Sequence, residues 1–294
     1  MKKKTGLLFV LPGFIVIVCF TYAPLIFGFV MSLFGGKGQN INFVGIENYE
    51  KLMNDNTFQL SLINSLWFAI IIIPIILIFS IILSLCLYQI KNARLKRAFL
   101  FMLYLPCITS PVAYALFFKQ IAYADGILTN FLSSIKLCFT NESILSNQWS
   151  ARIYISIICV WAWTGFYVLI INAALQNIDR NIIKSAQIDG ASNLCILNKI
   201  ILHSIYPVII LVSVLVACSS LQIYIEIALI TKGGPEMSTY TLVFYLYRKT
   251  FTYVADYGYS VTIGIIIMLF SLLISSIALF VRLVKSNAIK KNYF

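Results

Sequence analysis

Three polar side chains interrupt a long apolar run in the second half of the chain, and their spacing predicts a shared surface. Ser219, Gln222 and Glu226 follow one another at intervals of three and four residues, which places them on one face of a continuous helix. Tyr224 lies on a neighbouring face of that helix. Hydroxyl, amide and carboxylate groups together donate and accept hydrogen bonds, as the hydroxyl groups of a sugar do. The run therefore predicts part of a pathway for a polar solute.

Two aromatic side chains one helical turn apart, Trp163 and Tyr167, lie in another apolar run. Aromatic rings suit the apolar faces of sugar rings, so both residues are further candidates for the pathway. Each set also has a simpler interpretation. The polar groups could bond neighbouring helices, with Glu226 near the outer water interface, and the aromatic rings could form a belt at the membrane surface.

The residues needed for a metal site, a disulfide framework or ATP binding are missing from the sequence. The chain has one histidine, His203, and no C-x-x-C pair, so it predicts neither a metal site nor a disulfide framework. No G-x-x-x-x-G-K-[ST] segment is present to hold the phosphates of ATP. We therefore expect that the chain is not an enzyme and binds no cofactor itself. The seven cysteines are Cys19, Cys86, Cys107, Cys138, Cys159, Cys195 and Cys218.

The composition is that of an integral membrane protein. Apolar residues make up 61% of the chain, charged residues 11%, and the mean hydropathy is +0.92. A soluble domain carries about 25% charged residues. The net charge of +12 would suggest nucleic-acid binding in a soluble protein. Here it indicates Lys and Arg gathered in cytoplasmic loops, so no nucleic-acid partner is expected.

Six apolar runs predict an all-α polytopic protein with six transmembrane helices in a single domain, residues 1–294. The first run is too long for a signal-peptide core. Pro74 lies inside the second, where a spanning helix tolerates proline. Pro106 and Pro111 predict a kinked or broken helix in the third, as is common beside a cavity. The runs cover about residues 6–33, 64–90, 98–123, 151–173, 204–230 and 259–284.

The distribution of positive charge predicts the topology. An even number of spans places both termini on one side, and most of the Lys and Arg residues lie on that side although its loops are shorter. The positive-inside rule therefore places both termini and the loop 174–203 in the cytoplasm.

That loop contains a short, well-delimited helix. Asp179 stands at the N-cap position and Gly190 at the position of a left-handed C-terminal residue. The apolar residues between them lie mostly on one side of the helix. A helix of this length is not stable alone, so it must dock onto something. The alternative is an interfacial helix lying on lipid. The apolar positions are Ile182, Ile183, Ala186 and Ile188.

The same loop resembles the cytoplasmic loop of permease subunits of binding-protein-dependent ABC importers. The resemblance rests on Ser185-Ala186, Asp189-Gly190-Ala191 and Ile200-Ile201-Leu202 at the family's spacing. Lys184 stands where the family has Glu, and His203 where it has Pro. Further segments resemble the carbohydrate branch, which includes maltose and glycerol-3-phosphate permeases, so the likeness runs from about residue 6 to 284. These segments are residues 43–49, 163–166, 231–235 and 257–260.

The resemblance implies the type I permease fold of ABC importers and a chain that works by alternating access in a prokaryotic cell membrane. It implies as partners a second homologous permease, two cytoplasmic ATPase subunits that bind ATP and Mg²⁺, and an extracellular solute-binding protein that delivers a saccharide. The 180–190 helix becomes the coupling helix. The implied coupling residues are Ile182, Lys184, Ser185, Ala186, Asp189, Gly190, Ala191, Ile200 and Leu202. The candidate substrate pathway is Trp163, Tyr167, Ser219, Gln222, Tyr224 and Glu226.

Three alternatives remain open. The first is an ion-coupled secondary transporter that works without an ATPase, although such carriers more often show internal repeats and charges in several spans. Here Glu226 and Lys119 are the only candidates for such charges. The second is an ABC permease for a polyamine, a metal or a phosphate ester, and the third is a membrane-embedded enzyme.

Overall fold

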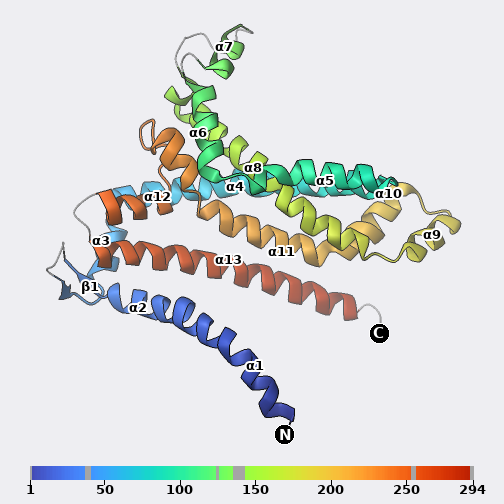
Figure 1. Cartoon of the computed structure of the whole chain (residues 1–294), viewed down its shortest axis with the longest axis horizontal. Helices are drawn as coiled ribbons and strands as arrows, with labels where there is room; N and C mark the ends of the chain where they lie inside the picture. Colours follow the sequence, from blue (N-terminus) through green and yellow to red (C-terminus); the bar gives the residue numbers. More distant parts are fainter. Residues whose placement is uncertain (1, 37–40, 124–125, 135–142, 253–255, 292–294) are drawn as a thin grey trace. The chain divides into compact units, whose positions relative to one another are not determined.

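The computed structural model describes residues 2–36, 41–123, 126–134, 143–252 and 256–291 (Figure 1). Most of these residues are helical. The β-structure of the described part is one short antiparallel pair, in which β1 (Phe34–Gly35) faces β2 (Asn42–Phe43). The all-α class is therefore confirmed. Cys138 lies outside the described residues.

The chain divides into two compact units. The first comprises residues 1–60 and 242–270, and the second residues 61–241 and 271–294. Besides the two strands, the elements of the first unit are α1 (Lys2–Ile17), the π-helix η1 (Val18–Tyr22), α2 (Ala23–Met31), α3 (Glu47–Met53), α12 (Leu242–Tyr247) and the π-helix η5 (Arg248–Thr252). Two long helices, α4 (Asn56–Gln89) and α13 (Tyr257–Lys291), run from one unit into the other.

The second unit contains the apolar runs in the middle of the chain. Its elements are α5 (Ala93–Ile108), α6 (Pro111–Ala122), α7 (Ile127–Ser134), the 3-10 helix η2 (Ile144–Ser146), α8 (Gln148–Gln176), α9 (Arg180–Ile188), α10 (Asn193–Cys195), the π-helix η3 (Ile196–Ile201), α11 (Leu202–Leu221) and the π-helix η4 (Ile227–Thr231).

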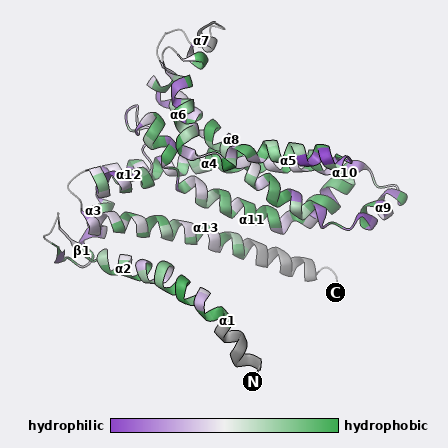
Figure 2. Ribbon diagram, in the orientation of Figure 1, coloured by the Kyte–Doolittle hydropathy of each residue, from purple (hydrophilic) through white to green (hydrophobic). Residues whose placement is uncertain are grey.

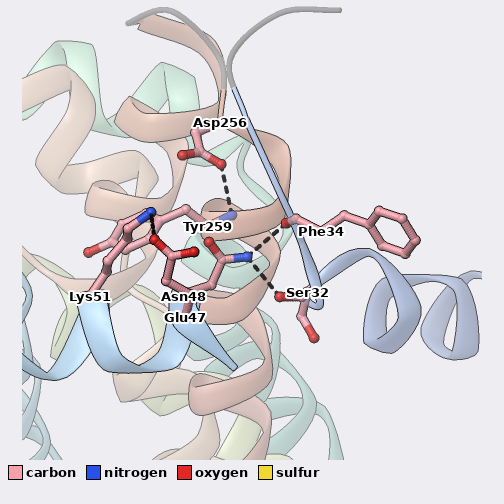
Figure 3. A network of polar contacts seen from close by, with 7 residues as sticks. All are labelled: Ser32, Phe34, Glu47, Asn48, Lys51, Asp256 and Tyr259. Carbon is pink, nitrogen blue, oxygen red and sulfur yellow. Dashed lines mark hydrogen bonds and ion pairs between the residues drawn. The ribbon is translucent and has the colours of Figure 1, made fainter. Parts of the chain in front are cut away.

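Within the first unit, a buried asparagine fixes the turn that follows α2. The Asn48 amide donates to the carbonyl oxygens of Ser32 at 2.8 Å and Phe34 at 2.7 Å (Figure 3). Gly258, at the start of α13, lies directly against this turn, because an added Cβ would meet the Phe34 oxygen at 1.7 Å. Asp256 caps the same helix by accepting from the Tyr259 amide at 3.1 Å (Figure 3). The connection from the first span is therefore held by hydrogen bonds from the Asn48 side chain and by the close approach of Gly258.

A second anchor of the first unit is the Asp55 carboxylate, which caps the start of α4. It accepts the hydroxyls of Tyr245 and, at 2.6 Å, Tyr259, and the amides of Thr57 and Phe58. Burial raises the pKa of Asp55, but these four donors outweigh it and leave that pKa below its usual value. The Asp55 anchor is therefore an anion at neutral pH.

Five helices in the described part of the chain are long and apolar enough to cross a membrane. Counting α5 and α6 as one broken span raises the number to six; the pair is bent by more than 40° at the break between Ile108 and Pro111. The proline pair predicted this break correctly, and α4 continues through Pro74 as expected. The five helices cover Phe9–Met31, Asn56–Gln89, Gln148–Gln176, Asn193–Leu221 and Tyr257–Phe280.

The predicted fifth run, residues 204–230, is not one uninterrupted helix. The span begins earlier, at Asn193, and its helix ends at Leu221, where Gln222 adopts φ −106° and ψ 16°. The chain becomes helical again only just before η4. The expectation that Ser219, Gln222 and Glu226 share one helix face is therefore wrong. The Ile-rich sequence contains no local signal for this break.

Two helices of the second unit, α5 and α8, approach closely at one glycine. A Cβ on Gly165 would lie 1.8 Å from the Leu103 carbonyl oxygen and 3.1 Å from the Tyr104 Cα. Only a residue without a side chain allows this backbone-to-backbone contact.

We predict that Gly165→Ala destabilises the protein, although the same change in an ordinary helix is stabilising. The overlap is with backbone rather than with a flexible side chain, so overpacking should cost about 1–3 kcal/mol. Thermal unfolding in detergent measures the effect. Gly264→Ala is the matched control, because its Cβ would meet only the Leu246 Cδ1 at 3.4 Å. Equal stability of the two variants would contradict the close contact.

Candidate functional site

A cavity of about 440 Å³ lies in the second unit where α5, α8 and the end of α11 meet. It is partly open, and its wall combines four aromatic rings with hydroxyl, amide and thiol groups. The lining residues are Tyr104, Cys107, Trp163, Phe166, Tyr167, Ser219 and Gln222. Four of the six residues predicted for the pathway, Trp163, Tyr167, Ser219 and Gln222, are therefore brought together in this cavity, which is named the solute pocket after that prediction.

The periodicity of α8 explains how the aromatic wall forms. Trp163, Phe166 and Tyr167 are spaced by three and four residues, so their side chains project from one face of the helix. Gly165 lies on the same stretch and lets α5 approach, which brings Tyr104 and Cys107 to the opposite side of the pocket. The close helix contact is thus what positions the two walls.

Hydrogen bonds hold the polar side chains of the pocket in place. The hydroxyl groups of Tyr167 and Ser219 lie 3.2 Å apart and join α8 to α11. The Cys107 thiol donates to the Ala162 carbonyl oxygen at 2.9 Å and joins α5 to α8. Gln222, beyond the end of α11, is exposed and lines the pocket. Its side chain is therefore accessible from the pocket.

The two remaining candidates lie elsewhere because the helix breaks at Gln222. Tyr224 is half-buried and does not line the pocket. The Glu226 side chain is only 4% exposed and accepts the hydroxyl of Tyr114, on α6, at 2.5 Å. This contact fits the simpler interpretation, in which the polar groups bond neighbouring helices.

The loop 231–240, which begins at the last residue of η4, is held by a polar network. Asn64 donates to the carbonyl oxygens of Met237 at 2.8 Å and Tyr240 at 3.1 Å. Arg152 donates to the Ser238 oxygen at 2.8 Å and to the Asn64 side-chain oxygen at 2.7 Å. These contacts fix a loop in which Met237 has a positive φ of 56°.

The guanidinium of Arg152 is also flanked by two indole rings. Its Cζ lies 5.4 Å from the Trp67 centroid and 5.3 Å from the Trp149 centroid. Such cation–π contacts stabilise a cation that is partly removed from water. The Gly-Gly-Pro segment at residues 233–235 therefore belongs to a loop whose shape is set by tertiary contacts.

The predicted short helix forms as α9, with both of its capping signals. Asp179 accepts from the Asn181 amide at 2.9 Å, and Gly190 has φ +80°. At the C-terminus the Gly190 amide donates to Gln187 at 3.1 Å, and the Ala191 amide donates to Ala186 at 2.9 Å. This pair of bonds is the Schellman motif.

The apolar face of α9 is only partly covered within the described chain, since Ile183 and Ala186 are half-buried. No residue of the helix is buried; Ile182 is 54% and Ile188 86% exposed. Leu194, just beyond it, is 72% exposed. The helix carries hydrophilic and hydrophobic residues side by side (Figure 2). Its exposed apolar residues fit a surface for another protein or for lipid.

Beyond α9, the remaining coupling candidates lie on a helical path toward the solute pocket. Ile200 lies in η3 and Leu202 begins α11, and both are half-buried. The helical stretch Asn193–Leu221 ends next to Gln222. One continuous rod therefore connects the α9 region with the solute pocket.

The sequence of this chain matches a known protein family over the region that contains the pocket and α9. The family described as "Binding-protein-dependent transport system inner membrane component" matches residues 86–285, which is more than half of the chain. The chain belongs to this family. The resemblance read from the 174–203 loop is thereby confirmed, as is a place among ABC importer permeases of the inner membrane.

Individual members of the permease family match over nearly their whole length. The lactose transport system permease protein LacF of Rhizobium radiobacter is 34% identical over 268 residues, which cover 90% of this chain and 89% of LacF. The arabinooligosaccharides transport system permease protein AraP of Bacillus subtilis (strain 168) is 30% identical over 285 residues, covering 95% of this chain and 88% of AraP.

Solved structures confirm the permease fold. A chain from a bacterial alginate ABC transporter in complex with an alginate pentasaccharide-bound periplasmic protein matches with a TM-score of 0.79 at 24% identity, over 94% of this chain and 93% of its own. A chain from a bacterial ABC transporter involved in alginate import matches with a TM-score of 0.78 at 24% identity, over 95% and 96%. At this identity the likeness establishes the fold alone.

Several residues of this permease were not singled out from the sequence. Tyr104 and Cys107 were missed because nothing in the sequence shows which face of α5 meets α8. Asn64 and Arg152 were missed because their partners are backbone groups far along the chain. A polar residue within an apolar run, such as Asn64, is the one signal that could have drawn attention.

Proposed function

We propose that this permease subunit carries a saccharide through the solute pocket, as part of an ATP-driven importer. The observation that carries the proposal is the pocket wall, where four aromatic rings stand beside the Gln222 amide and the hydroxyl of Ser219. Aromatic faces suit sugar rings, and the polar groups suit sugar hydroxyls. The names of LacF and AraP, a lactose and an arabinooligosaccharide permease, support the same class of solute.

The orientation we propose places both termini and α9 in the cytoplasm of a prokaryotic cell. Lys91, Arg94, Lys96 and Arg97 cluster around the turn between α4 and α5, and the hydrophilic end of α5 stands out in Figure 2. A short loop with this charge stays in the cytoplasm. The opposite ends of the spans, including the loop 231–240, then face outward.

The partners we propose follow from this arrangement. A solute-binding protein docks outside and releases the saccharide, and a second homologous permease completes the pathway. Two cytoplasmic ATPase subunits supply energy from ATP and Mg²⁺, since the chain has no phosphate-binding loop of its own. In this scheme the chain itself catalyses no reaction.

Coupling is assigned to α9 and its flanks. The apolar face of α9, on which Ile182 is exposed and Ala186 half-buried, docks in a groove of an ATPase, and Lys184 and Ser185 lie beside it. Asp189, Gly190 and Ala191 form the turn that sets the angle of the helix. Movement then passes along the rod Asn193–Leu221 (29 residues), about 43 Å at 1.5 Å per residue, to the solute pocket. Ile200 and Leu202 lie on this rod.

The first prediction from the proposed function distinguishes an ATP-driven importer from a secondary transporter that works without an ATPase. In proteoliposomes, uptake of a labelled oligosaccharide should require the second permease, the ATPase subunits, ATP and the binding protein. The chain alone should carry none, because it contains no energy-transducing site. Uptake by the chain alone, driven by an ion gradient, would contradict the importer.

The second prediction tests the solute pocket. Gln222→Ala removes one hydrogen-bonding side chain from its wall, and one such bond is worth about 0.5–1.5 kcal/mol. Sugar uptake at saturating binding protein should fall about three- to tenfold, with unchanged membrane insertion. Gln120→Ala is the control, since Gln120 is exposed on α6 and does not line the pocket. Equal uptake by both variants would argue against this pocket.

The third prediction concerns the turn after α9. Gly190→Pro should leave the chain in the membrane but uncouple ATP hydrolysis from uptake. Proline requires a φ near −65° and has no N–H, whereas Gly190 has φ +80° and donates to Gln187. Gly190→Asn is the control, because asparagine tolerates the left-handed region and keeps its amide. The ratio of sugar imported to ATP hydrolysed measures coupling, and a normal ratio for Gly190→Pro would refute the lever role.

A further inference from the structure

The Glu226 carboxylate is buried in a membrane-spanning region without serving the solute pocket. Its bond to the Tyr114 hydroxyl is short, 2.5 Å, and both residues are nearly inaccessible, at 4% and 5% exposure. Burying a carboxyl group within a membrane-spanning region costs free energy, so its presence points to a functional role. The bond joins α6 to the segment that leads into η4.

The same tyrosine contacts α8, the helix that carries the aromatic wall of the pocket. The Tyr114 ring packs against Trp161, two residues before Trp163 in the sequence.

The position of the pair relative to the two broken spans indicates its role. Tyr114 lies just beyond the break between α5 and α6, and Glu226 just beyond the break at Gln222. The pocket residues come from α5 before the first break, from the end of α11 up to Gln222 at the second break, and from α8. In the orientation proposed above, the bond joins the outer halves of both broken spans, on the outer side of the pocket.

Aromatic rings reinforce this junction. Tyr114 packs edge-to-face on Trp161 with centroids 6.0 Å apart, and Trp161 packs on Phe118 at 5.2 Å. Phe118 in turn meets Tyr154 at 6.4 Å. The outer segment α6 is thus held on α8 by a row of rings that includes the tyrosine of the polar bond.

We propose that the Tyr114–Glu226 bond is the outer gate of the solute pocket. A polar pair suits a gate, because its groups satisfy each other when it is closed and are satisfied by water when it is open. An apolar pair would be stable only when closed. The non-helical residues Thr109, Ser110 and Gln222 supply the backbone hinges. The assignment of this side as outer rests on the proposed function.

The test uses Cys107, which lines the pocket, as a reporter. The six other cysteines are replaced by alanine, and the chain is assembled with its partners in right-side-out vesicles without nucleotide. A membrane-impermeant thiol reagent is added outside. Labelling of Cys107 should be slow in this parent protein. Tyr114→Phe should accelerate it at least about fivefold, because the buried Glu226 side chain loses its hydrogen-bond partner.

Two further variants separate gating from general loosening. Tyr154→Phe also removes a buried hydroxyl that joins α8 to α6, since Tyr154 donates to the Phe118 oxygen at 2.6 Å, but it leaves Glu226 untouched. It should be labelled as slowly as the parent. Glu226→Leu removes the other half of the gate and should match Tyr114→Phe, which keeps the test decisive if one of the two variants fails to insert.

Labelling and transport are read independently. If Tyr114→Phe and Glu226→Leu label no faster than Tyr154→Phe, or if the parent labels rapidly from outside, the gate is refuted even when the parent imports sugar. If Cys107 is labelled faster in both gate variants but the parent imports no saccharide, the gate is supported and the proposed solute is wrong.

Discussion

Every backbone amide and carbonyl of a membrane-spanning segment must find a partner within the protein, and this requirement shapes the centre of the fold. At both helix breaks, the free backbone amide donates to a carbonyl oxygen three or four residues earlier in the chain. At the first break the Thr109 amide donates to the oxygens of Leu105 and Pro106, each at 3.2 Å. At the second break the Gln222 amide donates to the Ser219 oxygen at 3.0 Å. The chain can therefore interrupt its helices beside a cavity without leaving these amides unpaired.

The requirement also explains the polar residues around the loop 231–240. This loop is not a regular helix, so its carbonyl groups need donors from elsewhere. Asn64 serves Met237 and Tyr240, and Arg152 serves Ser238. Side chains that are costly in lipid are thus placed where they satisfy the backbone. The same logic applies to Glu226 and Tyr114, which satisfy each other.

Features set by local chemistry could be predicted from the sequence, and features set by helix contacts could not. Asp179 and Gly190 delimit α9 because capping depends only on neighbouring residues. Pro111 marked the break before α6 for the same reason. The end of α11 at Leu221 has no such local mark, so the predicted common face of Ser219 and Glu226 failed. The pocket residues on α8 and α11 were predicted in part. Tyr104 and Cys107 on α5 were not, since their place in the pocket depends on the contact of α5 with Gly165.

The exposure of the α9 region also has a consequence for the chain by itself. Ile182, Ile188 and Leu194 are exposed in the chain alone. Apolar side chains exposed together are a liability for aggregation until something covers them. Whatever covers the α9 region therefore also protects the chain from non-specific association.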